Sequence, residues 1–343
     1  MATEEFERAA LAVLAVFAAH TLSLAFLPAD VPAVARKRRA SMTAENRRAS
    51  APQHRQETRP EALSPALAPT RPRTVVAVPD KGLDLVAYEG LGSWIDLFNR
   101  GPWKNPGWTV GQMHRRGVRM IYLQTATYGS PRHIVHRQKV AEYITSAHRR
   151  GMTVIGWSVP SFTKWRKDLE RARAGLLFET EEGERFDSFA LDIEANIIDR
   201  IFIRNERLLK ISSGLRATAG PGYPLGAIIP DTHSSYWPSF PYKELADLYD
   251  VMIPMGYFTF GAHGYRSVRD YTARNIRQIR ANAGPDTPIH VIGGIADDVG
   301  VPAARGFVTA IRRHRVLGAS LYDFPITDDK TWKELSAIRR RSR

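Results

Sequence analysis

Two carboxylates, Asp192 and Glu194, lie two positions apart at the end of an apolar run, within the segment RFDSFALDIEAN at 185–196. Side chains of a β-strand alternate between two faces, so both acids share a face with the small residues Ser188 and Ala190. On one face their Cα atoms would be roughly 6.5–7 Å apart. Burial and the neighbouring charge would then raise the pKa of Glu194, which suits a general acid near neutral pH.

An acid pair of this kind needs a scaffold, and the sequence predicts one from alternating strand-like and helical patterns. Helical spacing of apolar residues is clear at 137–151 and 301–318. The alternation favours the α/β class and a (β/α)₈ TIM barrel over the alternative, a doubly wound sheet, which lacks a glycine-rich turn after its first strand. The eight strand-like runs lie at 93–98, 118–125, 152–159, 187–194, 224–230, 250–258, 289–296 and 318–324.

Such barrels carry their chemistry at the carboxyl ends of the strands, where we expect Asp192 and Glu194 to emerge. Polar groups and aromatic planes gathered at one mouth suit a sugar, which presents both hydroxyls and apolar faces. Each aromatic residue by itself is also typical of core packing. An acid pair can also lack a catalytic role and simply bind basic groups of nearby loops. The predicted sugar site therefore depends on the acids and the aromatic residues gathering at the same mouth. The predicted substrate-binding residues are Asp96, Tyr122, Gln124, Trp157, Met255, Tyr322, Asp323 and Trp237.

The chain divides into four parts. Residues 1–35 include an apolar run at 9–29 that is long enough to span a bilayer, which predicts a signal peptide or membrane anchor. The basic, Pro/Ala/Arg-rich stretch 36–73 carries half of the net charge of +14 and predicts a disordered linker. The barrel is expected at 74–339, with 340–343 as a basic tail.

The charge pattern around the apolar run leaves the topology open. The first eight residues are acidic, and basic residues at 36–39 would favour a domain facing the cytoplasm. A small-x-small site at 33–35 favours export, so an extracellular or membrane-anchored protein is the preferred interpretation, with a cytoplasmic-facing anchored protein as the alternative.

Composition and motifs exclude several classes of chemistry. The chain contains no cysteine, which rules out disulfides and thiolate sites, and it has neither a Gly-x-Ser-x-Gly elbow nor a P-loop. His133 and His136 are three apart but stand among basic residues, so no metal and no cofactor are predicted. We expect a monomer that binds an anionic envelope surface through its linker rather than nucleic acid.

Several stretches resemble a family of actinobacterial exported (β/α)₈ proteins that look like glycoside hydrolases. The resemblance implies the barrel fold and an action on carbohydrate, and it extends from Gly90 to Phe324. The stretches that carry it are GLGSWIDLF (90–98), GVRMIYLQTATY (117–128), FDSFALDIE (186–194), PGYPLGAIIP (221–230), YDVMIPMGYF (249–258), HVIGGIAD (290–297) and GASLYDF (318–324).

The fourth strand is also similar to the acidic signature of the chitinase-type hydrolase superfamily, Asp-Gly-x-Asp-x-Asp-x-Glu. Asp187, Asp192 and Glu194 match its first, third and last acids. Ser188 replaces the glycine and Ala190 replaces the middle acid, which is a departure from that pattern.

The run MIPMGYF resembles the Met-x-Tyr of the same superfamily, with Met255 and Tyr257 at the matching positions. The resemblance implies that Glu194 protonates the leaving oxygen. Asp192 would orient a substrate N-acetyl group that acts as internal nucleophile, and Tyr257 would hold its carbonyl.

Because Ala190 stands where that superfamily has an acid, a mechanism with two enzyme carboxylates stays open, with Asp96 or Asp323 as the partner. The LDIE motif at 191–194 also resembles the Chalaropsis-type lysozymes, which points to cell-wall glycans. The sequence thus predicts a glycoside hydrolase acting on an envelope or extracellular polysaccharide. The alternative is a non-catalytic carbohydrate-binding or envelope scaffold protein on the same barrel.

Overall fold

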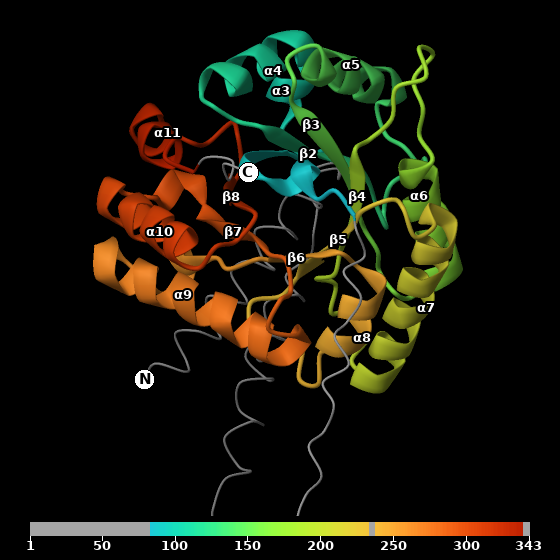
Figure 1. Ribbon diagram of the computed structural model, residues 1–343. Helices are drawn as coiled ribbons and strands as arrows, with labels where there is room; N and C mark the ends of the chain where they lie inside the picture. The colour runs from blue at the N-terminus through green and yellow to red at the C-terminus, as the bar shows by residue number, and fades with distance from the viewer. Residues whose placement is uncertain (1–82, 233–236, 339–343) are drawn as a thin grey trace, which may run out of the picture. The chain divides into compact units, whose positions relative to one another are not determined.

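The computed structural model describes residues 83–232 and 237–338, which form a barrel of eight parallel strands with helices between them (Figure 1). The hydrogen-bonded order is β6-β5-β4-β3-β2-β1-β8-β7. The strands are β1 (Gly90–Ile95), β2 (Met120–Thr127), β3 (Thr153–Val159), β4 (Ser188–Asp192), β5 (Leu225–Ile229), β6 (Val251–Pro254), β7 (His290–Ile295) and β8 (Gly318–Tyr322).

Two contacts close the ring. The first and last strands pair in parallel from Gly90 opposite Gly318 to Ser93 opposite Leu321. Between β6 and β7 the connection is looser and consists of isolated parallel bridges, one of which joins Met255 to Ile292. The predicted (β/α)₈ barrel is therefore confirmed, and the doubly wound sheet is excluded.

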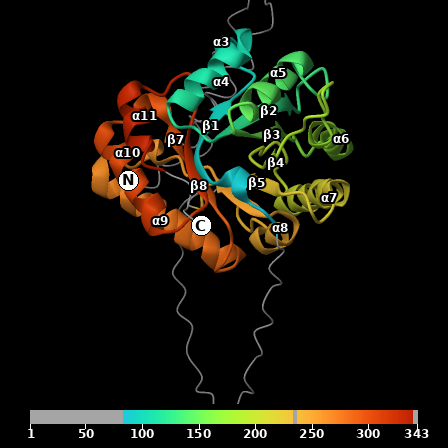
Figure 2. The same cartoon turned by 45° about the horizontal axis from the view of Figure 1, so that its top comes forward.

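The helices surround the strands, as Figure 2 shows. The β1–β2 connection has two helices, and a last helix follows β8. The α-helices are α3 (Arg100–Lys104), α4 (Pro106–Arg115), α5 (Arg137–His148), α6 (Trp165–Leu176), α7 (Ile201–Ala219), α8 (Tyr242–Leu248), α9 (Gly264–Ala283), α10 (Val301–Arg313) and α11 (Asp329–Leu335). Short 3₁₀ turns lie at η1 (Val86–Tyr88), η2 (Phe258–Phe260) and η3 (Ala296–Asp298).

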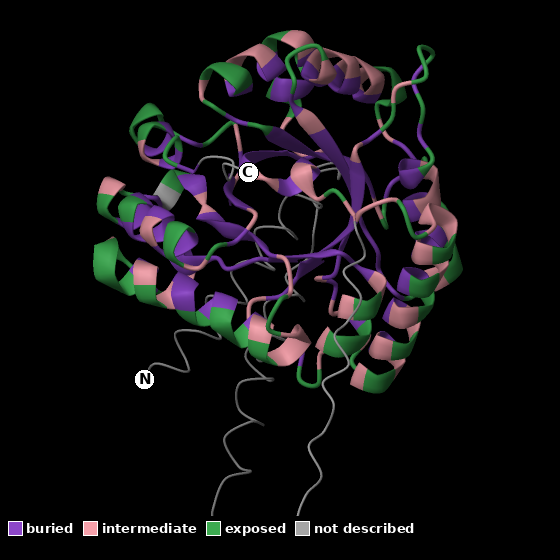
Figure 3. Ribbon diagram, viewed as in Figure 1, coloured by how far each residue is buried: buried purple, intermediate pink, exposed green. Residues whose placement is uncertain are grey.

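Strand β4 shows how the alternation of residues builds two separate cores. Phe189 and Leu191 pack outward in the large cluster between strands and helices. Ala190 faces inward, in a smaller cluster that fills the barrel with Trp94 and Tyr122. Figure 3 shows the result as buried strands inside helices whose outer faces are exposed.

The floor of the barrel is sealed by η1 and a set of buried hydrogen bonds. The hydroxyl of Tyr88 lies 2.5 Å from that of Ser188, which donates in turn to the carbonyl of Pro224 at 2.8 Å. His290 contacts the carbonyl of Tyr88 through Nδ1 (3.2 Å) and the hydroxyl of Ser320 through Nε2 (3.1 Å). Burial lowers the pKa of His290 to about 3, so its ring is neutral.

The bounds of the elements differ from the predicted ones mainly at their ends. Strand β4 ends at Asp192, so Glu194 lies in the following loop, and β6 ends at Pro254, before Met255 and Tyr257. The helices predicted at 137–151 and 301–318 end earlier, at His148 and Arg313, because the chain must turn toward the next strand.

The predicted signal peptide or anchor (1–35), the linker (36–73) and the basic tail (340–343) lie outside the described residues. Within 83–232 and 237–338, none of the helices is both long and apolar enough to cross a bilayer.

Candidate active site at the carboxyl end of the barrel

Asp192 and Glu194 emerge together where β4 stops. The amide of Ile193, between them, donates to the carbonyl of Ile228 on β5 at 2.8 Å, which keeps the strand geometry one residue beyond β4. Ile193 packs outward in the large core. The side chain of Ile193 thus points toward the surrounding helices. Because side chains alternate along a strand, those of Asp192 and Glu194 point into the barrel.

The two acids differ in exposure. Asp192 is 6% exposed, and its Oδ1 atom is buried without a hydrogen-bond partner among the described residues. Glu194 is partly exposed. A buried carboxylate oxygen without a donor is costly, so Asp192 favours its protonated form or a donor from a ligand.

Burial raises the pKa of both acids. Burial raises the pKa of Asp192 well above its usual range, and the neighbouring charge of Glu194 raises it further. Burial raises the pKa of Glu194 to about 7. Because the two groups interact, their protons come off as a pair, and the pair retains a proton near neutral pH.

A second acidic cluster lies at the ends of β1 and β8, two strands that pair directly. Asp96 accepts hydrogen bonds from the amides of Phe98 (2.8 Å) and Asn99 (2.9 Å) through Oδ1. The hydroxyl of Tyr322 donates to its Oδ2 at 2.5 Å. Three donors therefore hold the Asp96 carboxylate in place.

Asp323 follows directly and is only 4% exposed. Its pKa rises to about 8, chiefly because it is buried and further because Asp96 and Asp297 are close. Asp323 therefore favours its protonated form near neutral pH.

Aromatic rings fill the barrel below the mouth on the side of β1 to β3. Trp94 and Tyr122 stack with centroids 4.0 Å apart, and Trp157 meets Trp94 edge-on at 5.5 Å. Tyr122 is fully buried and Trp157 is 3% exposed. Their polar atoms, the Tyr122 hydroxyl and Trp157 Nε1, lack hydrogen-bond partners among the described residues. Both residues therefore lie in the packed interior, and their role in substrate binding stays a prediction.

Three other predicted residues lie within β2 or just after β6. Gln124 is buried and accepts a hydrogen bond from the amide of Leu97 (2.9 Å), which holds the loop after β1. Met255 and Tyr257 are each 8% exposed and belong to the cluster that fills the barrel. The rim thus gathers these side chains with Tyr322, which is partly exposed.

Trp237, predicted to extend a sugar platform, lies farther out. It is 3% exposed and its indole Nε1 donates to Oδ1 of Asn205 on α7 at 2.7 Å. It packs edge-on against Phe162 and belongs to the outer core. Most of its face is therefore occupied by protein.

Two buried arginines that the sequence did not single out hold the loops around the mouth. Arg204 donates to the carbonyl of Ile198, in the loop after Glu194, at 2.9 Å. Arg171 donates to the carbonyl of Ser130 at 2.9 Å and lies 3.6 Å from Asp168. Regular spacing of apolar residues cannot reveal such contacts, because they depend on how single arginine side chains reach loop carbonyls.

Asp168 in turn holds the loop after β3. Its Oδ2 atom accepts from the amides of Ser161 (3.1 Å) and Phe162 (3.0 Å). Burial raises its pKa, and these hydrogen bonds and Arg171 oppose that shift. The loops after β2 and β3 are thus fastened to α6.

Among the described residues, no group of three or more histidine, aspartate or glutamate side chains is arranged to hold a metal ion. His133 is exposed on the surface.

The fold and the paired acids define a (β/α)₈ barrel with a carboxylate site at the carboxyl end of its strands. No family model matches the sequence, and no curated protein matches it. Solved structures do resemble it. The chain superimposes on an endo-1,4-beta-mannanase from Rhizomucor miehei with TM-score 0.53 and 9% identity, covering 69% of this chain and 86% of that chain.

Chitinases are similar to the same degree. A plant class V chitinase mutant from Cycas revoluta in complex with (GlcNAc)3 has TM-score 0.54 and 11% identity, with coverage of 72% and 98% of the two chains. A chitinase from Bacteroides thetaiotaomicron has TM-score 0.52 and 12% identity, with coverage of 73% and 95%. At such identities the likeness shows the shared barrel.

Proposed function

We propose that this protein is a glycoside hydrolase in which Glu194 is the general acid and base. One observation carries the proposal: Asp192 and Glu194 lie together at the carboxyl end of β4, and the pair retains a proton near neutral pH because of burial and mutual repulsion. Glycosidic oxygens need a proton as the bond breaks, and a carboxyl with a pKa of about 7 supplies it efficiently.

In the proposed reaction Glu194 protonates the oxygen of the leaving sugar and then deprotonates the incoming water. Asp192, buried beside it, assists by sharing the proton of the pair and by accepting a hydrogen bond from the substrate at its Oδ1 atom. If the substrate carries an N-acetyl group, Asp192 and Tyr257 would orient it. Otherwise Asp96, which the hydroxyl of Tyr322 holds at the rim, is the side chain placed to stabilise positive charge on the sugar ring.

The substrate class we propose is an envelope or extracellular polysaccharide. The solved mannanase and chitinases that resemble this barrel lend support, since one of them holds (GlcNAc)3. We further propose that residues 1–35 direct export or anchor the chain, and that the basic stretch 36–73 keeps the barrel near an anionic surface.

The test is cleavage of a glycan panel by the full chain and by Glu194→Gln. We expect the substitution to lower kcat at least 100-fold, because it removes the proton donor while preserving the shape of the side chain. Activity of the native protein should fall as pH rises through about 7, where Glu194 loses its proton. Glu170→Gln, an exposed position on α6, is the matched control and should leave kcat unchanged. Equal turnover by Glu194→Gln and the native protein would remove Glu194 from the chemistry.

A second candidate is a non-catalytic carbohydrate-binding protein. It is favoured by Ala190, which stands where the chitinase-type signature has an acid, and by the aromatic rings of Trp94 and Trp157 that fill part of the barrel. Binding of glycans without products, undiminished in Glu194→Gln, would support this candidate. A protease-protection assay on intact cells separates an exported barrel from one that faces the cytoplasm.

A further inference from the structure

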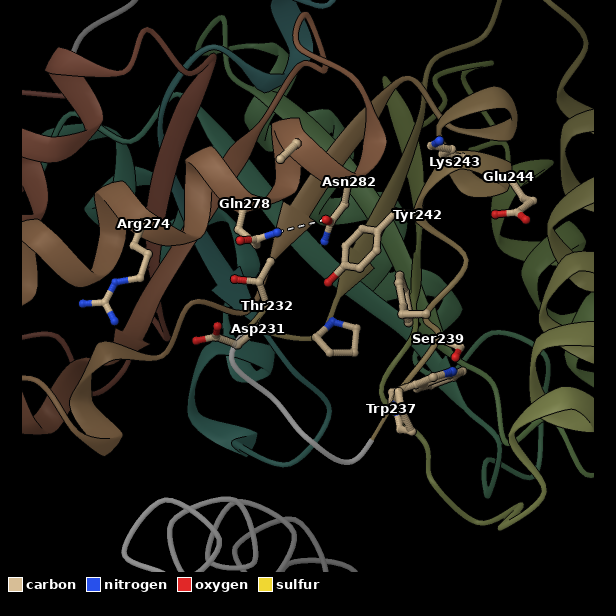
Figure 4. A pocket seen from close by; sticks show the side chains of 14 residues that line it. Asp231, Thr232, Trp237, Ser239, Tyr242, Lys243, Glu244, Arg274, Gln278 and Asn282 are labelled. Atoms are coloured by element: carbon tan, nitrogen blue, oxygen red, sulfur yellow. Dashed lines mark hydrogen bonds between the residues drawn. The ribbon is translucent and has the colours of Figure 1, made fainter. Parts of the chain in front are cut away.

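A pocket of about 790 Å³ opens outside the barrel, between α8, α9 and the end of β5. Figure 4 shows Arg274, Gln278 and Asn282 of α9 along one wall and Trp237 and Ser239 along the other. Its volume is within the range of small-molecule sites. Neither Asp192 nor Glu194 is among its lining residues. The hydroxyl of Tyr271 on α9 donates a hydrogen bond to Asp231 in the lining.

The lining points to a neutral, hydroxyl-rich ligand. The lining carries two carboxylates (Asp231 and Glu244) and two cations (Lys243 and Arg274). Their charges cancel, so the pocket favours neither anions nor cations. The rest of the polar lining consists of amides and hydroxyls, which can donate and accept as sugar hydroxyls do. These side chains are Gln278, Asn282, Thr232, Ser239 and Tyr242.

Apolar surface completes the match. Phe240 and Tyr242 pack edge-on with centroids 4.8 Å apart, and Trp237 meets Phe240 at 5.3 Å. Aromatic rings beside amides suit a sugar, whose C–H faces pack on rings while its hydroxyls bind polar groups. The amides are already oriented, because Nε2 of Gln278 donates to Oδ1 of Asn282 at 3.0 Å.

The aromatic wall is held in place from behind. Asn205 on α7 accepts from Trp237 (2.7 Å) and donates to the carbonyl of Ser239 (2.8 Å). The guanidinium of Arg204 lies over the Trp237 ring at 4.5 Å and also bonds the loop after Glu194 through Ile198. A wall fixed before binding loses little conformational entropy when a ligand enters. Arg204 thus connects the aromatic wall to the segment that carries the proposed acid.

We propose that this pocket is a second carbohydrate-binding site, which takes a neutral oligosaccharide segment away from the acid pair. The inference rests on the proposed function in one respect, since it takes the ligand to come from the same class of polysaccharide. The binding itself needs no cleavage. Gln278, Asn282 and Tyr242 provide the hydrogen bonds, and the partly exposed ring of Phe240 provides the apolar surface, supported from behind by Trp237.

The test measures binding stoichiometry in the full chain carrying Glu194→Gln, which stops turnover while leaving both sites. Calorimetric titrations use two probes, the trimer of N-acetylglucosamine and β-1,4-mannotriose. We expect two sites for at least one probe. The double substitution Gln278→Ala and Asn282→Ala should remove one site or weaken it at least tenfold. Arg277→Ala, an exposed neighbour on α9 outside the pocket, is the matched control and should keep both.

A second variant, which fills the pocket, distinguishes a loss of binding at this site from a loss caused by misfolding. Ala281 is exposed and lines the pocket, so Ala281→Trp should fill it and remove the same site while the melting temperature stays close to that of the parent. Absence of binding in the parent with both probes overturns the proposal, as does binding that both the double substitution and Ala281→Trp leave unchanged. A protein that binds glycans at this pocket but cleaves none would contradict the proposed function and would not contradict this second binding site.

Discussion

At the scale of single residues, carboxyl groups at the mouth of the barrel stay protonated at a pH at which they would be ionised in water. Asp323 is the clearest case, because burial and the nearby Asp96 raise its pKa to about 8. In the unfolded chain the same group titrates near 4. Between these two values the folded protein holds a proton that the unfolded chain has lost. The free energy of unfolding therefore falls as pH rises across that window.

Asp323→Asn should remove this contribution, because the amide has nearly the same shape and does not titrate. We expect urea unfolding of the native protein to show lower stability at pH 8 than at pH 5, and we expect Asp323→Asn to reduce that difference. Asp192 and Glu194 act in the same direction, so some of the decline remains. Asp286→Asn, at an exposed acid, is the control. A decline with pH that is as steep in Asp323→Asn as in the native protein would contradict this assignment.

At the scale of elements, the site depends on how closely α6 approaches β4. A Cβ atom at Gly175 of α6 would lie 2.4 Å from Cε2 of Phe189 on β4, which is too close for two carbon atoms. Phe189 is only three residues before Asp192. The absence of a side chain at Gly175 therefore allows the strand that carries the acids to pack against its helix.

We expect Gly175→Ala to lower the free energy of unfolding by about 1–3 kcal/mol, since the ring of Phe189 must shift. The gain in helix propensity, about 1 kcal/mol, offsets part of this loss. Gly111 of α4 is a matched control, because a Cβ there meets only the ends of arginine side chains at 3.8 Å or more. Gly111→Ala should stabilise the protein slightly. Equal effects of both substitutions in urea unfolding would disprove the packing argument.

The features that could be predicted from the sequence are those that depend on residues close together in the chain. Strand alternation is local, so the eight strands and the inward direction of Asp192 and Ala190 could be predicted from spacing alone. The burial of Trp157 and Trp237 depends on partners far away in the sequence, such as Trp94 and Asn205. The pocket at α9 was not predicted for the same reason, since its walls come from separate segments.

At the scale of the whole barrel, contacts between distant parts of the chain hold the floor and the rim. Trp94 donates to Ser320 at 2.8 Å, and His290 bonds the carbonyl of Tyr88, over separations of 226 and 202 residues. These bonds are buried, so each donor and acceptor that loses its partner is costly. The bond from His290 to Tyr88 fastens η1 beneath the strands.

Tyr88→Phe should lower the free energy of unfolding by about 1 kcal/mol, the usual net value of one hydrogen bond. The loss stays moderate because Ser188 keeps its bond to the carbonyl of Pro224. Denaturant unfolding measures it, and Tyr265→Phe, on the exposed side of α9, should have a smaller effect. A Tyr88→Phe protein as stable as the native one would mean that the bond to Ser188 contributes nothing.

The pairing of β1 with β8 has a consequence for synthesis. A nascent chain cannot complete its ring until the residues up to Tyr322 have left the ribosome, because the partner of the first strand is the last one. Until then the backbone edge of β1 has no strand to cover it, and such edges attract chaperones or other chains. A polypeptide that ends before Gly318 would keep that edge permanently uncovered, so shortened products should aggregate or be degraded rather than accumulate.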